Sequence, residues 1–250
     1  MDDMTKEYRA PDWETYRMDT THPHIRIEPM DRERETTGEA LELLRSDGML
    51  PHTHYDENKL LAHREAVEEL FEIPWTAITH RMQRIIWAIN AISQPRNMIA
   101  AGIFCGNTFI SNAGAAVGPG AVYTANDLLG VEILPNEAER AERNVRRSDS
   151  TGVAHIVAAD AVEVARNYPE EINLLYLDAD GDEARGKGIY LDILLQAFDK
   201  MPKGSLVLAH NSVNCAERLK HYLAFVRDSA NTANSVNLVI DGEGLEVSLI

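Results

Sequence analysis

Beyond Pro95, short apolar segments alternate with amphipathic segments of helical period through the rest of the chain. Such alternation is typical of βαβ units, in which helices connect and cover parallel strands. The alternation therefore predicts an α/β fold with a mostly parallel sheet. The seven expected strands occupy residues 97–104, 128–133, 155–159, 172–178, 205–209, 236–241 and 245–250.

The last two expected strands are separated only by Gly242, Glu243 and Gly244. So short a connection predicts an antiparallel hairpin instead of another crossover. Between the other strands, helices are expected to begin near residues 107, 135, 161, 189 and 214. The element order therefore predicts a Rossmann-like, seven-stranded, mostly parallel sheet with a C-terminal antiparallel hairpin.

The first 95 residues lack this alternation. Residues 1–36 are rich in charge and contain three prolines, so an extended arm is expected there. Apolar residues at helical spacing then predict three helices, the third of them capped by Thr79. These helices are expected near residues 37–47, 57–71 and 79–92. The chain is accordingly divided into an N-terminal arm and helical cap, residues 1–95, and a Rossmann-like domain, residues 96–250.

The chain carries a formal net charge of -16. Nucleic acids and anionic membranes bind mainly clustered Lys and Arg, so this charge argues against both as partners and favours a small-molecule substrate. No apolar run approaches the roughly 20 residues that cross a bilayer, and no signal-peptide pattern follows Met1, so a cytoplasmic protein is expected. Cys105 and Cys215 lack the spacing of a metal or redox pair and are expected to be reduced.

Small and acidic residues follow three consecutive strands of the expected sheet. Gly102 and Gly106 follow the first strand and let a ligand approach the backbone, although a simple tight turn also explains them. Glu132 ends the second strand, where nucleotide-binding α/β folds place an acid for ribose hydroxyls; an exposed strand-end carboxylate is the alternative. Asp160 and Ala161 follow the third strand, where they can face a nucleobase, and Asp160 can equally cap the next helix.

In their order and spacing, these residues make residues 97–250 resemble the class I S-adenosylmethionine-dependent methyltransferase family. The resemblance implies that S-adenosylmethionine is the cofactor, with its methionine end beside Gly102 and Gly106. It further implies that Glu132 binds the ribose, and that Asp160 and Ala161 face the adenine. The same cofactor site is expected to include Phe104, Asn107 and Asp178. NAD is the nearest competitor, but the two glycines lack the G-x-G-x-x-G spacing that holds a pyrophosphate.

Polar residues also end the fourth and fifth strands, next to the expected position of the sulfonium. The candidate catalytic residues are Tyr176, Asp178, His210, Asn211 and Ser212. Metal-dependent catechol methyltransferases are similar in carrying Asp at the fourth strand and Asp-Asn at the fifth, but His210 replaces one of those acids. Because Mg²⁺ prefers oxygen ligands, no metal is expected, and His210 or Asp178 is the candidate general base. A transition metal on the imidazole and a purely structural His210 are the alternatives.

Three functions compete for this site. The first is methyl transfer from S-adenosylmethionine to a small-molecule acceptor. The second is a cyclase reaction, in which the amine of S-adenosylmethionine attacks its own γ-carbon and releases azetidine-2-carboxylate and methylthioadenosine. Ala100 motivates it, because the family commonly carries there an acid that holds the ammonium. The third is a sensor without catalysis, against which the polar strand ends argue. The acceptor, metal need and oligomeric state stay open, a homodimer being one alternative.

Overall fold

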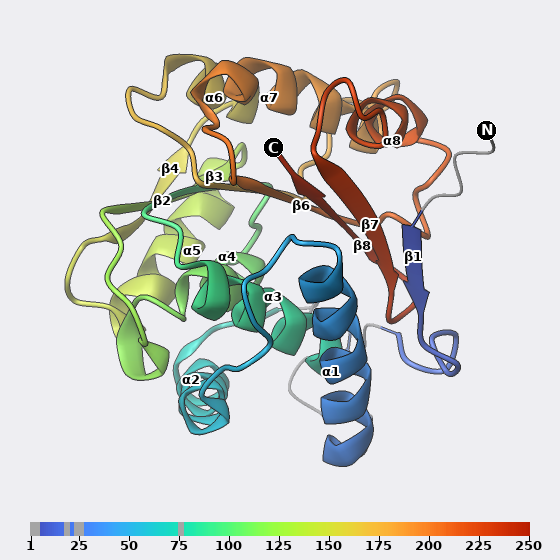
Figure 1. Ribbon diagram of the computed structural model, residues 1–250. Coiled ribbons are helices and arrows are strands. Elements are labelled where there is room, and N and C mark those ends of the chain that lie inside the picture. Colours follow the sequence, from blue (N-terminus) through green and yellow to red (C-terminus); the bar gives the residue numbers. More distant parts are fainter. Residues whose placement is uncertain (1–5, 18–20, 23–27, 75–77) are drawn as a thin grey trace.

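A computed structural model describes residues 6–17, 21–22, 28–74 and 78–250, and one eight-stranded sheet forms its centre (Figure 1). The strands are β1 (Lys6–Arg9), β2 (Asn97–Ala101), β3 (Asp127–Glu132), β4 (Ala154–Ala158), β5 (Leu174–Leu177), β6 (Leu206–His210), β7 (Asn234–Val239) and β8 (Leu245–Leu249). They lie in the order β1-β7-β8-β6-β5-β2-β3-β4. Every strand expected beyond Pro95 is therefore present.

Neighbouring strands run parallel except at β8, which is antiparallel to both β6 and β7. The turn between β7 and β8 is held by Asp241, whose Oδ1 accepts hydrogen bonds from the backbone N–H groups of Glu243 at 3.1 Å and Gly244 at 3.0 Å. The prediction of a Rossmann-like, mostly parallel sheet with a C-terminal antiparallel hairpin is confirmed.

The eighth strand, β1, comes from the N-terminal arm and exceeds the seven that were predicted. It pairs in parallel with β7, with Lys6 opposite Val236 and Arg9 opposite Val239. Its four residues are mostly charged and exposed, so they carry no apolar periodicity that predicts a strand. The pairing arises from the open edge of β7, where backbone N–H and C=O groups need partners.

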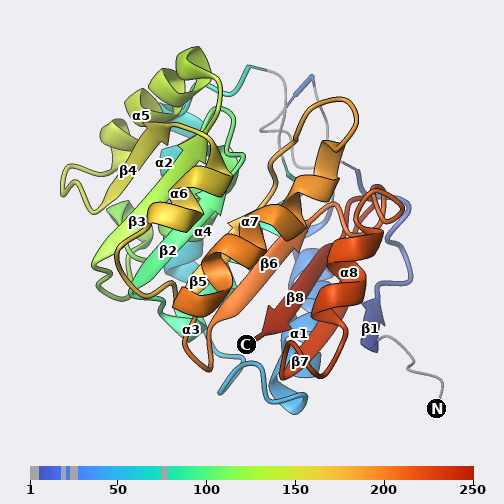
Figure 2. The same cartoon turned by 90° about the horizontal axis from the view of Figure 1, so that it is seen from above.

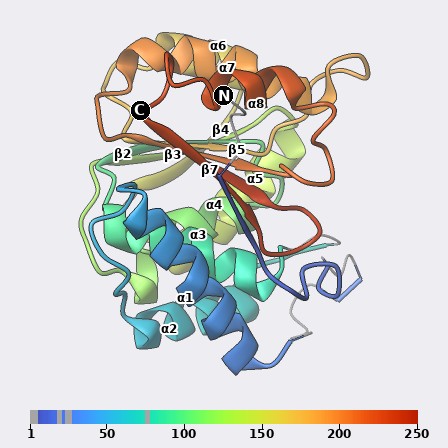
Figure 3. The ribbon, with the colours of Figure 1, turned by 45° about the vertical axis from the view of Figure 1, so that its right-hand side comes forward.

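Helices cover both faces of the sheet and give the molecule three layers (Figure 1 and Figure 3). They are α1 (Met30–Ser46), α2 (Glu57–Leu70), α3 (His80–Ser93), α4 (Asn107–Ala113), α5 (Pro135–Ser148), α6 (Ala161–Asn167), α7 (Ile189–Ala197) and α8 (Lys220–Val226). Residues of α1 to α5 share one apolar core with the sheet. Residues of α6, α7 and α8 form a second core on the opposite face, which faces the viewer in Figure 2. None of the described helices is both long and apolar enough to cross a membrane.

Two helices begin at positions other than those predicted. The first, α1, begins at Met30 instead of near residue 37. Its first turn carries Asp31 and Glu33, whose charges the positive end of the helix dipole favours. The last, α8, begins at Lys220, after a run of turns that follows the end of β6. By contrast, the predicted cap of α3 is confirmed, because Thr79 Oγ1 accepts a hydrogen bond from the backbone N–H of Met82 at 3.1 Å.

The N-terminal helices pack within the same core as the helices that follow β2. Ile86 and Ile89 of α3 are fully buried and belong to the core that contains Phe109 of α4 and Leu128 of β3. The division of the chain at residue 95 stays a prediction. What the packing establishes is that α3 forms part of the layer that covers one face of the sheet.

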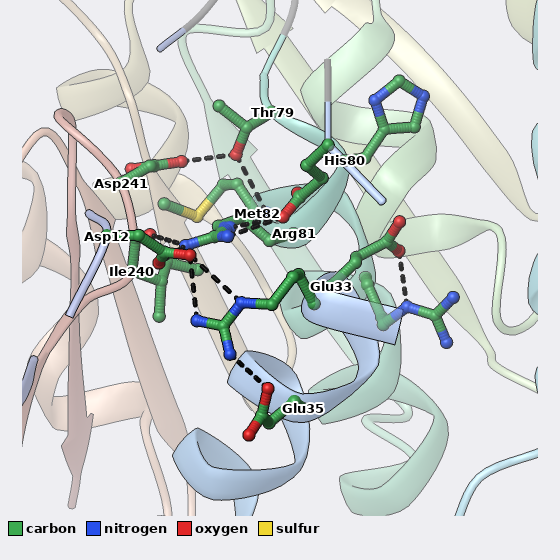
Figure 4. A network of polar contacts seen from close by, with 12 residues as sticks. Asp12, Glu33, Glu35, Thr79, His80, Arg81, Met82, Ile240 and Asp241 are labelled. Atoms are coloured by element: carbon green, nitrogen blue, oxygen red, sulfur yellow. Dashed lines mark hydrogen bonds and ion pairs between the residues drawn. The ribbon is translucent and has the colours of Figure 1, made fainter. Parts of the chain in front are cut away.

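Two fully buried arginines of α3, Arg81 and Arg84, connect the arm and α1 to the rest of the protein. We call the group Asp12, Glu28, Glu33, Arg81 and Arg84 the arm network. Arg81 donates hydrogen bonds to Glu28 at 2.6 Å, to Asp12 at 3.0 Å and to the carbonyl of Ile240 at 2.7 Å. Arg84 Nε donates to Glu33 Oε1 at 2.5 Å. Figure 4 shows part of this network beside the hydrogen bond from Thr79 Oγ1 to Asp241 Oδ2, which is 2.5 Å long.

Candidate active site

A cavity of about 550 Å³ lies at the carboxyl ends of β2, β3, β4 and β5. Strand β2 is central among them, with β3 on one side and β5 on the other, so the strand order reverses here. Open α/β sheets bind ligands at such a switch point. The volume is also within the range of small-molecule sites.

The turn after β2 forms one wall of the cavity through Gly102, Phe104 and Asn107. Gly102 has a φ of 78°, and a Cβ on it would lie 2.3 Å from the Cα of Ala179. The close approach of the β2 and β5 loops therefore requires glycine at this position. Gly106, with a φ of 90°, precedes α4 but is not among the residues that line the cavity. A Cβ on Gly106 would meet Ala141 of α5, so its role in the structure is helix packing.

Glu132 is buried at the end of β3 and lines the same cavity. Its Oε2 accepts a hydrogen bond from the backbone N–H of Phe104 at 2.8 Å, and its Oε1 accepts one from Leu134 at 3.0 Å. The carboxylate thus fixes the glycine turn relative to β3. Each carboxylate oxygen has a further lone pair, so Glu132 retains the capacity to accept hydrogen bonds from a ligand.

Asp160 and Ala161 line the cavity from the end of β4. Asp160 also caps α6, since its Oδ1 accepts a hydrogen bond from the backbone N–H of Val162 at 2.7 Å. The predicted cap is therefore confirmed. The two expected roles are compatible in this geometry, and contact with a nucleobase stays a prediction.

Asp178 follows β5 and lies between the side chains of Lys187 and His210. Lys187, in the 3₁₀ turn η2 (Gly186–Gly188), donates to Asp178 Oδ1 at 2.9 Å and to the Asp178 carbonyl at 2.7 Å. His210 Nδ1 lies 3.3 Å from Asp178 Oδ2. Asp180 Oδ2 also lies 3.3 Å from the Lys187 ammonium. We call Asp178, Lys187 and His210 the lysine cluster.

The charges of the lysine cluster support one another. Burial alone would raise the pKa of Asp178, but Lys187 and His210 outweigh it and hold that pKa below its usual value. Burial alone would lower the pKa of Lys187, and the carboxylates of Asp178 and Asp180 raise it instead. The pKa of His210 is likewise raised, because Asp178 and Asp241 outweigh its burial and the repulsion from Lys187. Each group of the cluster therefore favours the charged form of its oppositely charged neighbour.

The structure brings some predicted catalytic residues to the cavity wall and leaves others behind it. Asp178 and Asn211 line the cavity. Tyr176, His210 and Ser212 are buried and are not among the lining residues. Ser212 Oγ instead donates to Asn237 Oδ1 at 2.7 Å. The predicted polar cluster thus faces the cavity only in part: Asp178 and Asn211 follow the ends of β5 and β6, whereas Tyr176 and His210 lie within those strands. Direct catalytic roles for all five residues stay predictions.

Sequence reasoning missed the lysine and several apolar residues of the cavity. Lys187 follows β5 in a loop without periodicity, and only its position between two glycines distinguishes it. The backbone N–H of Gly181 donates to the carbonyl of Gly186 at 2.9 Å, which folds this loop back toward β5. The missed apolar residues include Ile78, Ile133 and Leu134. The last two are about half exposed directly after Glu132, a pattern that does suggest a binding surface.

The residues around Asp178 do not fit a divalent cation. Lys187 already contacts the carboxylate oxygen that faces the loop, and His210 contacts the other. A metal ion on Asp178 would lie against the Lys187 ammonium, and the two positive charges would repel. Within the described part of the chain, no group of three or more His, Cys, Asp and Glu side chains has the arrangement of a metal site.

No protein-family model matches this sequence, and neither does any curated protein. Solved structures do match. The methyltransferase PaMTH1 from Podospora anserina, bound to S-adenosylhomocysteine (SAH), has a TM-score of 0.61 at 12% identity, over 90% of this chain and 98% of its own. Cofactor-bound Rv0187 from MTB has a TM-score of 0.59 at 17% identity, over 78% of this chain and 90% of its own. An O-methyltransferase from Bacillus cereus, in complex with SAH, has a TM-score of 0.56 at 12% identity, over 86% of this chain and 99% of its own.

All three matches have TM-scores above 0.5 despite their low sequence identity. Each spans at least 90% of the solved chain, so the likeness extends to the whole architecture. The chain therefore has the fold of the class I S-adenosylmethionine-dependent methyltransferases.

Proposed function

We propose that this chain is an S-adenosylmethionine-dependent methyltransferase that acts on a small-molecule acceptor. The cavity carries the proposal: it joins the glycine turn after β2 to Glu132 and Asp160 at the ends of the next two strands. Structural neighbours of the same fold are described with SAH or S-adenosylmethionine bound. A nucleoside with an adjoining amino acid matches the chemistry of this wall.

Each residue of the wall has a distinct part in binding. Glu132 is fixed by two backbone N–H groups, so its remaining lone pairs are oriented to accept hydrogen bonds from ribose hydroxyls. Asp160 and Ala161 lie where an adenine edge can meet a carboxylate and a backbone N–H. Gly102 lines the cavity beside the β5 loop, where the methionine end would lie. When bound, the cofactor would supply an electrophilic methyl group.

The acceptor must lose a proton if its attacking atom is a hydroxyl. Asp178 lines the cavity, but its pKa is held low by Lys187 and His210 despite burial, so it is a weak general base. His210 contacts Asp178 from behind the wall, which makes it a positioning residue in this proposal. Ionisation of the acceptor then depends on positive charge near its oxygen.

The cyclase alternative gains no observation in its favour. Ala100, which motivated it, is fully buried in β2 and is not among the residues that line the cavity. An intramolecular cyclisation would also need a pocket closed over the cofactor, with no room for an acceptor. Of the described residues before β2, Ile78 alone lines the cavity, so the described N-terminal helices do not close over it. Methyl transfer is therefore the function that we propose.

Calorimetry with SAH tests the cofactor site directly. Wild-type protein is expected to bind it, and Glu132→Gln and Asp160→Asn are each expected to weaken binding by about tenfold or more, because each removes a charge-assisted hydrogen bond. The matched control is Glu163→Gln, an exposed carboxylate of α6 that pairs with Arg166 and is not among the cavity-lining residues. Unchanged affinity in both site variants would refute the assignment of this wall.

Mass spectrometry of the products tests the reaction. Incubation with S-adenosylmethionine alone should leave it intact, whereas addition of an acceptor mixture should yield SAH and an acceptor heavier by one methylene. Release of methylthioadenosine and a cyclic imino acid without acceptor would instead establish the cyclase. Binding without either product would point to the sensor.

A further inference from the structure

The cavity holds a positive charge that belongs to the protein itself. Lys187 lines the cavity, although the residue is only 8% exposed. Its ammonium is anchored by the carbonyl and the carboxylate of Asp178, at 2.7 and 2.9 Å. The ring of Tyr190 lies beneath it, 5.7 Å from the nitrogen to the ring centre. The charge is thus fixed in position and stays in place without a bound ion.

The third contact of the ammonium is the replaceable one. Asp180 lies 3.3 Å away, and 63% of its side chain is exposed, against 16% for Asp178. An exposed carboxylate is held weakly because water competes for it. An anionic oxygen that enters the cavity can therefore take the place of Asp180 beside Lys187 without disturbing the buried pair.

Apolar side chains surround the rest of this space. Ile78, Phe104 and Ile189 line the same cavity as Lys187 and Asn211. An acceptor that combines an apolar body with one acidic hydroxyl would match this cavity, in which apolar side chains lie beside one cationic side chain. Asn211, held at a φ of 65° directly after β6, adds an amide that can hydrogen-bond the same oxygen.

We propose that Lys187 is a built-in cation that binds and ionises the acidic hydroxyl of the acceptor, so that the protein needs no divalent metal for this step. The proposal rests on the proposed function. The hydroxyl gives up its proton to solvent, and the resulting oxyanion pairs with the ammonium, because a nearby positive charge lowers the pKa of an acid. Lys187 keeps its own protons throughout and is a binding residue.

Absorbance spectroscopy with 4-nitrophenol tests the ionisation, since the phenolate and the neutral phenol absorb at different wavelengths. At a pH about one unit below the pKa of the free probe, wild-type protein is expected to produce the phenolate band, both with and without SAH. Excess EDTA should leave the band unchanged. Lys187→Met should reduce the band at least about tenfold, and Lys187→Arg should retain most of it.

The controls separate ionisation from folding. Lys220→Met removes an exposed lysine that pairs with Glu217, and it should behave as wild type. Circular dichroism and SAH affinity report whether each Lys187 variant keeps its fold. If wild type shows no phenolate band, if Lys187→Met keeps the band, or if EDTA abolishes it, the proposal is wrong. Failure of wild type to bind SAH would refute the proposed function instead, and the titration without SAH still decides the role of Lys187.

Electron paramagnetic resonance with Mn²⁺ gives an independent answer. Wild-type protein should leave the signal of free Mn²⁺ unchanged, because the Lys187 ammonium already contacts Asp178 Oδ1 and would repel a second cation there. Binding of Mn²⁺ by wild type that is lost in Asp178→Asn would overturn the built-in cation. Lys187→Met removes the competing charge and is expected to bind Mn²⁺ more tightly than wild type.

Discussion

The arm network and the lysine cluster are both built from buried charges near the carboxyl edge of one sheet, yet they differ in what they face. Arg81 and Arg84 have no exposed side-chain surface, and their partners include residues of the arm, α1, α2 and the loop after β7. Lys187 and Asp178 keep 10% and 16% of their side chains exposed, and they open onto the cavity. Burial of charge therefore does not identify a functional site; access to a cavity does.

The two clusters should also differ in energy. A charge sealed away from water loses its compensation entirely when its partner is removed, whereas a charge at a cavity wall can be rehydrated. The comparison thus predicts large stability effects in the arm network and smaller stability effects, with loss of binding, in the lysine cluster. The variants below test that ranking.

The largest effect is expected from Arg81→Met, which leaves Glu28 buried without its cation. Breaking a buried pair on one side destabilises a protein by about 3–5 kcal/mol. Urea denaturation measures the change, and Arg45→Met, at an exposed i,i+3 pair with Glu42, is the control that should leave the midpoint unchanged. SAH affinity per folded molecule should stay at the wild-type value, since Arg81 does not line the cavity. A weakened SAH affinity would mean that the arm network also influences binding in the cavity.

A smaller loss of stability is expected from Asp178→Asn. It leaves Lys187 with its bond to the backbone carbonyl and its contact with Asp180, and cavity water can reach the ammonium. The loss of one charged hydrogen-bond partner is worth about 1.5–3 kcal/mol. The same denaturation experiment measures it, and the 4-nitrophenol titration should change in parallel. A destabilisation larger than that of Arg81→Met would invert the comparison.

Thr79→Val tests the connection between the start of α3 and the β7–β8 turn. Thr79 caps α3 and donates to Asp241, which in turn holds the β7–β8 turn. Loss of the cap and the hydrogen bond is expected to lower the free energy of unfolding by about 1–2 kcal/mol. Thermal unfolding followed by circular dichroism detects a change of this size. Ser46→Ala, which removes an exposed hydroxyl that bonds within α1, should produce no comparable shift.

A further effect is a dependence of stability on pH, through Glu243. Burial and the neighbouring Asp241 raise the pKa of Glu243 to about 7, against the opposing influence of His210 and Arg17. A raised pKa favours the protonated form in the folded state, so this contribution to stability is complete below about pH 4.5 and is lost as the pH rises through about 7. Denaturation at several pH values should show that decline, and Glu243→Gln should flatten it. An equal slope in the variant would assign the decline to another group.

The strands and the candidate binding residues at their ends could be predicted because they depend on the local sequence pattern. Alternating apolar segments located all strands beyond Pro95, and the cap at Thr79 followed from the residue type that caps helices. Gly102, Glu132 and Asp160 could be placed at one edge, since the carboxyl ends of parallel strands meet there. β1 could not be predicted, because its charged residues pair only where β7 leaves an edge open.

Periodicity and the succession of elements are properties of short segments, so the order of amino acids was enough to predict the α/β architecture and the edge of the sheet that carries the site. Which side chains reach the cavity depends instead on packing between distant segments. It turned Tyr176 and Ser212 inward, brought Lys187 from a loop of no distinct pattern onto Asp178, and buried Arg81 among carboxylates from distant segments. Contacts between residues far apart in the chain follow from packing, and packing has no local signature in the sequence.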